Sequence, residues 1–206
     1  MLYVGLTGNI ASGKTAAAQR FAARGATILD ADELAREVVQ PGAPAYDPIV
    51  RRWGDRIVGP DGALDREALR HIVFGDRSQL DELNAIVHPA IVELRRQRVG
   101  EARERGDSVL MYVAPLLFER HLADEFDRII LVDAPRGVRL RRLIESRGIP
   151  AEDAVNMISS QMPAELKRAR ADFVIENTGS LHDLERQVDA VWERLTASGA
   201  RSSLAV

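Results

Sequence analysis

The chain has 206 residues, of which 46% are hydrophobic and 29% are charged, and it contains no cysteine. This length suffices for one substantial core, and the missing cysteines exclude disulfides and thiolate metal sites. A formal net charge of −3 argues against non-specific binding to nucleic acid. Because the sequence also lacks a long apolar span and a signal-peptide pattern at its start, we expect a cytoplasmic protein that does not contact membranes.

The first predicted element is a short apolar strand at 2–7, and a phosphate-binding pattern follows it directly. Residues 8–15 read Gly-Asn-Ile-Ala-Ser-Gly-Lys-Thr and match G-x-x-x-x-G-K-[ST] at every fixed position. In such a loop the backbone N–H groups surround a polyphosphate, Lys14 reaches its terminal phosphates, and the Thr15 hydroxyl is available to Mg²⁺. A run of helix formers comes next and stops at Gly25. Strand, loop and helix in this order are the context that the motif requires.

Five apolar runs of strand character alternate with helical stretches along the chain. Each shows little polar alternation, as expected for strands buried on both faces of a parallel sheet. The alternation predicts an α/β fold: a three-layer, doubly wound parallel five-stranded sheet like that of P-loop NTPases, with ligands at the carboxyl ends of the strands. The five runs are 2–7, 26–30, 108–113, 128–132 and 172–175.

A helical insert is predicted between the second and third strands, at about 60–105. The predicted helices are 65–73, 79–87 and 91–105, the last ending at Gly106. We expect His88-Pro89 to separate the second helix from the third, because a residue before proline avoids the helical region. At the other end of the chain, the tail from Ser198 is predicted to be disordered.

A carboxylate pair, Asp30 and Asp32, closes the second strand. At the carboxyl edge of the sheet these side chains would face the phosphate-binding loop. A carboxylate there can accept a proton from an attacking hydroxyl or hold Mg²⁺ waters. Alternatively, one of the two caps the helix that begins near Glu33. Beside a phosphate-binding loop we favour the functional interpretation, chiefly for Asp32.

The insert between the fourth and fifth strands is rich in arginine. Arg139 and Arg142 lie three residues apart and can share a helix face, and Arg147 follows after another turn. Such a group is either a solvated helix face with Glu145 as partner or a set of cations that stabilises a transferring phosphoryl group. Small-molecule P-loop kinases carry a mobile lid at this place, which favours the functional interpretation for Arg142 and Arg147.

Other segments carry weaker signals. His88 has no second His or Cys at metal spacing, and Pro115–Glu119 can be core or a wall for a substrate. Asn177, after the fifth strand, can line an adenine pocket or make a turn. The third strand carries no acid at 109–113, so Mg²⁺ would depend on Thr15, nucleotide oxygens and water, with Asp32 or Glu119 as a further candidate.

Several short motifs follow one another in a fixed order along the chain. They are Leu6-Thr7-Gly8 with Gly13-Lys14-Thr15, Asp30-Ala31-Asp32, Val39-Gln40-Pro41-Gly42, His88-Pro89, Pro115-Leu116-Leu117-Phe118-Glu119, Arg142 with Arg147, Gln161, Lys167, Ala171-Asp172, and Ile175-Glu176-Asn177 before Gly179. This ordered set resembles the dephospho-coenzyme A kinase family, and the resemblance runs from Leu2 to about Leu195. The loop alone is generic to P-loop proteins, whereas the Asp-Ala-Asp, His-Pro and Pro-Leu-Leu-Phe-Glu motifs are the most telling.

The resemblance implies an ATP-dependent kinase that phosphorylates the ribose 3′-hydroxyl of dephospho-coenzyme A, the last step of coenzyme A synthesis. It implies ATP and dephospho-coenzyme A as substrates, with Mg²⁺ as cofactor. It also implies a division of the chain into a nucleotide-binding core, a helical dephospho-coenzyme A-binding subdomain and a lid. The predicted bounds are 1–59, 106–134 and 171–197 for the core, 60–105 for the subdomain, 135–170 for the lid and 198–206 for the disordered tail.

Site residues are carried over on the matching positions. The expected catalytic residues are Asp32, Lys14, Arg142 and Arg147. The expected ATP-binding residues are Gly8, Ala11, Ser12, Gly13, Lys14, Thr15, Ala16, Arg142 and Asn177. The expected substrate-binding residues are Asp32, His88, Leu116 and Glu119, and Thr15, with water, is the expected Mg²⁺ ligand.

The sequence departs from the family pattern at a few positions. Asn9 and Ala11 stand where glycines are common, so we expect a stiffer loop that still works. Ala16 stands where Thr is frequent, at little cost. Arg139 replaces a common Gln, and no role is carried onto it.

Two other classes of protein also carry a phosphate-binding loop of this kind. A GTPase-type switch would need an Asn-Lys-x-Asp signature, which does not occur in the chain. Another small-molecule P-loop kinase, for a nucleoside or nucleoside monophosphate, is compatible with the loop, and only the later motifs argue against it. The sequence carries no signal for an oligomeric state.

Overall fold

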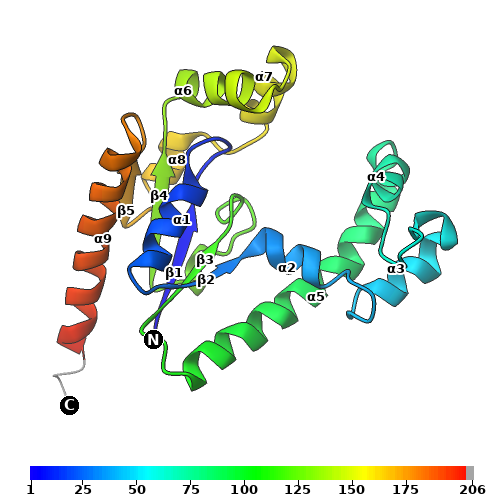
Figure 1. Ribbon diagram of the computed structural model, residues 1–206, viewed down its shortest axis with the longest axis horizontal. Helices are drawn as coiled ribbons and strands as arrows, with labels where there is room; N and C mark the ends of the chain where they lie inside the picture. The colour runs from blue at the N-terminus through cyan, green and yellow to red at the C-terminus, as the bar shows by residue number, and fades with distance from the viewer. Residues whose placement is uncertain (203–206) are drawn as a thin grey trace. The chain divides into compact units, whose positions relative to one another are not determined.

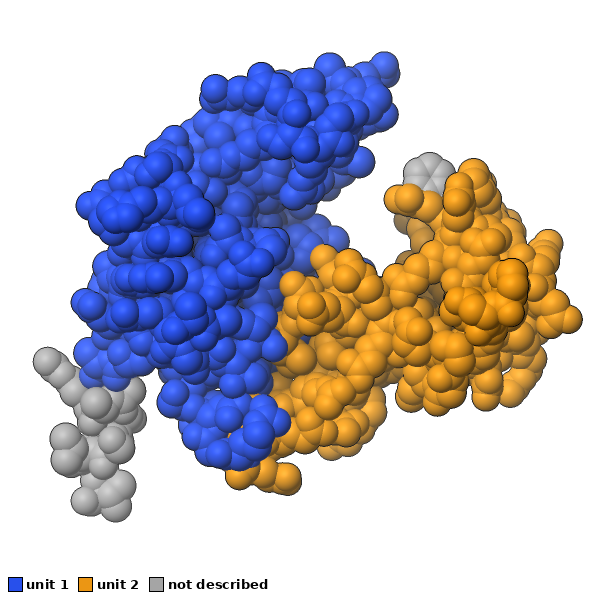
Figure 2. Space-filling model, in the orientation of Figure 1, with its two compact units in different colours: residues 1–28, 105–206 blue, residues 29–104 orange. Residues whose placement is uncertain are grey.

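The computed structural model describes residues 1–202. Within them the chain folds into two units that Figure 2 shows in different colours. One comprises residues 1–28 and 105–206 and is called the sheet unit below; the other comprises residues 29–104 and is called the helical unit. The helical unit begins at Leu29, so the insert predicted at 60–105 covers only its later part.

The five predicted strands form one sheet in the order β2-β3-β1-β4-β5. Strand β1 (Leu2–Thr7) pairs in parallel with β3 (Val109–Val113) and β4 (Arg128–Asp133), and β4 pairs in parallel with β5 (Phe173–Glu176). Strand β2 (Thr27–Asp30) lies at the edge beside β3. Each observed strand matches its predicted range to within a residue or so, because continuous apolar runs can be buried on both faces of a sheet.

Helices α1 (Lys14–Ala23) and α9 (Leu181–Ser202) pack together over one face of the sheet (Figure 1). Their apolar sides form the main core with β1, β3 and β4; its fully buried members include Val4, Leu6, Ala17, Phe21, Met111, Ile130 and Val188. Because α9 continues to Ser202, residues 198–202 are helical, which corrects the predicted disordered tail in that part. Residues 203–206 of that prediction lie outside the described residues.

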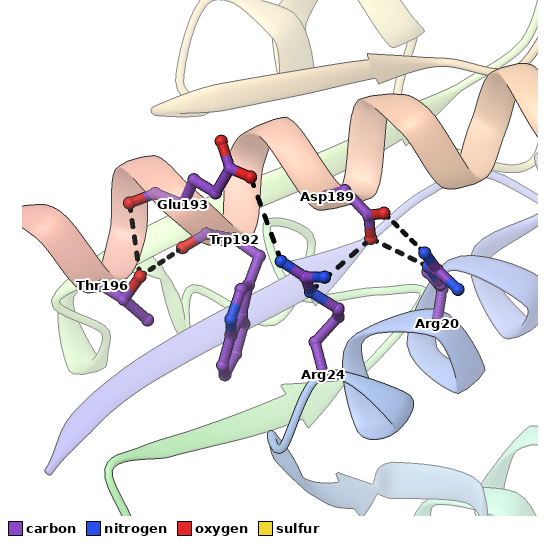
Figure 3. A network of polar contacts seen from close by, with 6 residues as sticks. All are labelled: Arg20, Arg24, Asp189, Trp192, Glu193 and Thr196. Carbon is purple, nitrogen blue, oxygen red and sulfur yellow. Dashed lines mark hydrogen bonds and ion pairs between the residues drawn. The ribbon is translucent and has the colours of Figure 1, made fainter.

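Polar contacts also tie α1 to α9 (Figure 3). Arg20 donates two hydrogen bonds to the Asp189 carboxylate, at 2.8 and 2.5 Å, and Arg24 lies 3.7 Å from it. The hydrogen bond from Arg20 holds the pKa of Asp189 below its usual range. Phe21 and Trp192 add a tilted ring contact. The helix that begins at the phosphate-binding loop is therefore fastened to α9 at its C-terminal end.

The opposite face of the sheet is covered by the segment after β3, which includes the short helical turn η2 (Ala123–Glu125). Leu117 and Phe118 are fully buried, and Phe126 stacks on Tyr112. A Cβ on Gly5 would lie 2.6 Å from Leu117, so glycine is what allows this close approach to β1.

The predicted lid segment contains helix α6 (Arg136–Arg141), the π-helical turn η3 (Arg142–Ser146), α7 (Ala151–Ser159) and α8 (Ala164–Arg168). Leu143, Ala154 and Ile158 form a small core of their own, against which Ile10 and Ala11 of the phosphate-binding loop pack. A π-helical turn inside a helix is rare and frequently marks a functional site.

The helical unit holds α2 (Ala31–Glu37), α3 (Tyr46–Trp53), η1 (Asp55–Ile57), α4 (Arg66–Phe74) and α5 (Arg77–Glu104). Asp65 caps α4 by accepting the N–H groups of Glu67 and Ala68. A separate apolar cluster centred on Val38, Ile49, Trp53 and Ile57 forms its core. Among the described residues, no helix combines the length and the apolar character that crossing a membrane demands.

The predicted break at His88-Pro89 is wrong, because α5 runs through it without interruption. Pro89 lacks an N–H and cannot close a helical hydrogen bond, at a cost of about 3 kcal/mol in a helix interior. Apolar residues on both sides of it, including Val87, Ala90, Ile91 and Leu94, pack against the core of the helical unit. Tertiary packing thus outweighs the local preference of the sequence.

Candidate active site

The phosphate-binding loop connects β1 to α1 in the sheet unit. Gly13 is the N-cap residue of α1 and has a φ of 96°. The Ala17 N–H donates to the Gly13 carbonyl at 3.2 Å. The Ser12 N–H donates to the Asn9 carbonyl at 3.0 Å and closes a turn within the loop. The amides of the first turn of α1 therefore lie at an open helix N-terminus, which favours an anion.

Two of the loop glycines are required by close contacts. A Cβ on Gly8 would lie 2.5 Å from the Val132 carbonyl oxygen, and one on Gly13 would lie 2.0 Å from Asn177 Nδ2. Ala11, by contrast, carries a Cβ at a φ of 59°, a conformation that is unfavourable for any residue but glycine. Both glycines thus stand where a Cβ would meet a close neighbour, whereas alanine occupies the left-handed position at residue 11.

Arg142 and Asn177 hold the loop from outside. Arg142 Nη1 donates to the Ala11 carbonyl at 3.1 Å, and its Nη2 donates to the Asn177 carbonyl at 3.1 Å. Asn177 Nδ2 donates to the Ser12 carbonyl at 2.7 Å, and the Asn177 N–H donates to Asp133 at 2.7 Å. These bonds join the π-helical turn η3 of the predicted lid and the end of β5 to the loop between β1 and α1.

Five of the predicted ATP-binding residues line one cavity of about 390 Å³ in the sheet unit. These five are Ala11, Gly13, Ala16, Arg142 and Asn177. Arg147, predicted as a lid arginine, lines the same cavity, together with Ser146, Gly179, Leu181 and Leu184. The lining of the cavity combines cationic and polar side chains with apolar ones. That combination suits a base attached to a phosphate chain.

The lid arginines differ in their surroundings. Burial, and then the positive charge of Arg141, lowers the pKa of Arg142, and an anion would offset this lost solvation. Burial also lowers the pKa of Arg139, which is 5% exposed and donates from Nε to the Ala134 carbonyl. Arg139 faces a different cavity, of about 370 Å³. Arg147 is exposed.

Asp30 and Asp32 have separate roles in the helical unit. Strand β2 ends at Asp30, whose carboxylate accepts the Asp32 N–H at 2.7 Å and caps α2. Asp32 is exposed in the first turn of that helix, and no ion pair or side-chain hydrogen bond of its carboxylate exists among the residues described. The helix cap, which the sequence allowed for either residue, is therefore formed by Asp30, and the Asp32 carboxylate takes no part in it.

Glu119 is engaged by the predicted lid. Its Oε1 lies 2.8 Å from Lys167 Nζ and accepts the Met162 N–H at 3.1 Å. Lys167 is fully buried and also donates to the Pro115 carbonyl at 3.2 Å. Glu119 Oε2 is buried without a hydrogen-bond partner in the described structure. Leu116, next to this network, is half-buried.

The remaining predicted residues lie on helices. His88 is half-buried in the middle of α5. Lys14 and Thr15 form the first turn of α1, where Thr15 is exposed. No three His, Asp or Glu side chains of residues 1–202 gather into a group that could hold a metal ion. The Thr15 hydroxyl alone is compatible with Mg²⁺, because this ion usually has few protein ligands and is bound mainly by substrate phosphates and water.

Sequence reasoning assigned no role to three polar residues at this edge of the sheet. Gln161 Oε1 accepts the Ile10 N–H of the loop at 2.8 Å, and Lys167 holds Glu119. Arg168 bridges Asp133 and Glu176, at 2.7 and 2.5 Å. Gln161 and Lys167 belong to the ordered set of family motifs, and their place in that set is the signal that indicated them in the sequence.

Comparison with known proteins agrees with this geometry. A family model described as dephospho-CoA kinase matches residues 2–183. Dephospho-CoA kinase from Thermobifida fusca (strain YX) is 45% identical over 195 residues, which cover 95% of this chain and 96% of the relative. The crystal structure of TT1252 from Thermus thermophilus is 37% identical, with a TM-score of 0.77 over 94% of this chain and 97% of that one. Dephospho-CoA kinase from Campylobacter jejuni, at 22% identity, shares the fold with a TM-score of 0.68, over 93% of this chain and 96% of that one.

Proposed function

Because the chain belongs to the dephospho-CoA kinase family, we propose that Asp32, Lys14, Arg142 and Arg147 carry the phosphoryl transfer of that family. The reaction moves the ATP γ-phosphoryl group to the ribose 3′-hydroxyl of dephospho-CoA and gives coenzyme A and ADP. The observation that supports this assignment best is the cavity in which loop residues, Arg142, Arg147 and Asn177 converge. In phosphoryl transfer the protein mainly positions the reactants and stabilises charge.

The nucleotide is proposed to bind along the loop and into this cavity. Gly8, Gly13 and the first turn of α1 would surround the phosphates with backbone N–H groups, and Ser12, whose own N–H is bonded to the Asn9 carbonyl, would lie next to them. Lys14 would contact the terminal phosphates, and Ala11, Ala16 and Asn177 would line the base end. Arg142, whose guanidinium is partly desolvated, would gain the most from a phosphate anion, and exposed Arg147 would join it when the lid closes.

Mg²⁺ is proposed to be held by the Thr15 hydroxyl, phosphate oxygens and water. Thr15 fits because it is exposed at the start of α1, next to the open helix N-terminus. When bound, the ion neutralises charge on the phosphates. The structure around β3 agrees with a minimal site, since Val109–Val113 are apolar and buried and carry no acid.

Asp32 is proposed to orient the 3′-hydroxyl and accept its proton. The observation that supports this role is that the Asp32 carboxylate is exposed in the first turn of α2, while the capping of this helix is done by Asp30. His88, Leu116 and Glu119 are proposed as further contacts of the dephospho-CoA substrate. For Glu119 the support is the buried Oε2 without a protein partner in the described structure. A cytoplasmic location remains a prediction from the sequence.

An assay of ADP release tests the substrate assignment. The purified protein is given ATP and Mg²⁺ with dephospho-CoA, adenosine, AMP or shikimate, one at a time. We expect rapid ADP release with dephospho-CoA alone. Activity confined to a nucleoside or nucleoside monophosphate would overturn the assignment.

A further inference from the structure

Residues 9–11 of the loop, between its two glycines, are each held by the predicted lid segment. Arg142 binds the Ala11 carbonyl, as described above. The other two contacts come from the turn between α7 and α8. Gln161 Oε1 accepts the Ile10 N–H at 2.8 Å, and the Met162 carbonyl accepts Asn9 Nδ2 at 3.2 Å. The loop therefore meets two distant parts of the insert, 130 to 153 residues away in the chain.

The turn that carries Gln161 is itself firmly attached. The Met162 N–H donates to Glu119, and Glu119 pairs with the fully buried Lys167 of α8. Lys167 in turn donates to the Pro115 carbonyl, which also accepts the Thr7 hydroxyl at 3.3 Å. A chain of hydrogen bonds thus runs from the end of β1 through the insert and back to the loop that follows β1. Gln161 is placed on a rigid support, as a positioning group requires.

The loop amides are divided between protein and ligand by these contacts. The Ile10 N–H is taken by Gln161 and the Ser12 N–H by the Asn9 carbonyl. The first contact fixes the peptide before Ile10 and the second fixes the peptide after Ala11, and the φ of Ala11 between them is 59°. The amides farther along, at the start of α1, are then directed towards the anion site. Because alanine disfavours the left-handed conformation that Ala11 adopts, these contacts help to maintain it.

We propose that Gln161 is a positioning residue for ATP: its carboxamide oxygen holds the Ile10 amide and so keeps the loop in its phosphate-binding form. This inference rests on the proposed nucleotide site. It assigns Gln161 no contact with the nucleotide and no part in the chemical step. Its effect should therefore appear in the affinity for phosphate groups and not in the affinity for the base.

The decisive variant is Gln161→Leu, which keeps the approximate shape of the side chain and removes the acceptor oxygen. Binding of tripolyphosphate, ATP and adenosine is measured by calorimetry, in the presence of Mg²⁺ for the two phosphates. The affinity for tripolyphosphate and ATP should fall about fivefold, the value of one hydrogen bond, while that for adenosine stays constant. The KM for ATP should rise by the same factor and kcat should hardly change.

Two further variants separate positioning from stability. Gln161→Glu keeps an oxygen acceptor and should restore most of the affinity when salt screens its charge. Gln187→Leu removes the same type of bond elsewhere, since Gln187 Oε1 accepts the Glu176 N–H at 2.9 Å. It should lower the melting temperature but leave tripolyphosphate binding as in the wild type.

Three results would overturn the proposal. They are wild-type affinity for tripolyphosphate in Gln161→Leu, an equal loss in Gln187→Leu, or an equal loss for adenosine. Failure of the proposed kinase function would be seen separately, as a wild-type protein that binds tripolyphosphate but does not phosphorylate dephospho-CoA.

Discussion

The phosphate-binding loop of the sheet unit and Asp32 of the helical unit are held in opposite ways. Residues 9–11 of the loop each share a hydrogen bond with the predicted lid segment. Asp32 is exposed, and its neighbour Asp30 provides the cap of α2. The loop proposed to bind the nucleotide is thus preorganised by protein contacts, which lowers the cost of binding. The proposed proton acceptor keeps its carboxylate for the substrate.

The largest effect is expected at Asp32, a residue of the helical unit whose carboxylate forms no ion pair or hydrogen bond in the described structure. Asp32→Asn removes the proton acceptor and should lower kcat about a thousandfold, within the range of general-base catalysis. The dissociation constant for ATP, measured by calorimetry, should stay within about twofold of the wild-type value, because the loop needs no help from Asp32.

Asp30→Asn is the matched control for this variant. Asparagine caps a helix about as well as aspartate, so the variant should fold and turn over like the wild type. Wild-type turnover in Asp32→Asn, or an equal loss in Asp30→Asn, would contradict the assignment of the two residues.

The next largest effect is expected in the support of the loop. Lys167→Met removes the buried cation and leaves Glu119 without its partner. Breaking a buried ion pair costs 3–5 kcal/mol in general, and because Glu119 is 22% exposed we expect about 2 to 3 kcal/mol. Urea unfolding followed by circular dichroism measures the loss.

A double variant tests the cause of that loss. Lys167→Met with Glu119→Leu replaces both partners by apolar groups and should recover most of the stability. A single variant that unfolds like the wild type would show that the ion pair does not support the loop.

Much of the fold was predictable from the sequence, and the features that were not depend on contacts between residues far apart in the chain. The strands and the phosphate-binding motif depend on neighbouring residues, so local patterns find them. The uninterrupted α5 depends on packing across the helical unit, which no local rule at Pro89 contains. The bond from Gln161 to Ile10 joins residues 151 apart, and only the folded chain brings them together. The capping alternative was open from sequence because Asp30 and Asp32 are chemically the same.

A smaller effect is expected at Arg142, which holds the loop and lines the cavity proposed for the nucleotide. Arg142→Lys cannot reach the Ala11 and Asn177 carbonyls together with one ammonium group. The KM for ATP should rise about tenfold, with a smaller change in the KM for dephospho-CoA. Arg141→Lys is the matched control, since Arg141 is the exposed neighbour in the same helix. A wild-type KM for ATP in Arg142→Lys would mean that charge alone matters at this position.

The smallest effect is expected at Ala11, and it tests whether contacts or glycine shape the loop. Ala11→Gly relieves a left-handed alanine, worth about 1 kcal/mol. Against this stand the greater freedom of the unfolded chain, about 0.4 to 1 kcal/mol, and the loss of a partly buried methyl group, below about 0.8 kcal/mol. The terms nearly cancel, so the free energy of unfolding should change by less than about 1 kcal/mol, and ATP affinity should change little because Arg142 and Gln161 still hold the loop. Gly13→Ala should weaken ATP binding far more, since its Cβ would lie 2.0 Å from Asn177 Nδ2. A large gain in ATP affinity in Ala11→Gly would instead show that alanine strains the loop away from its binding form.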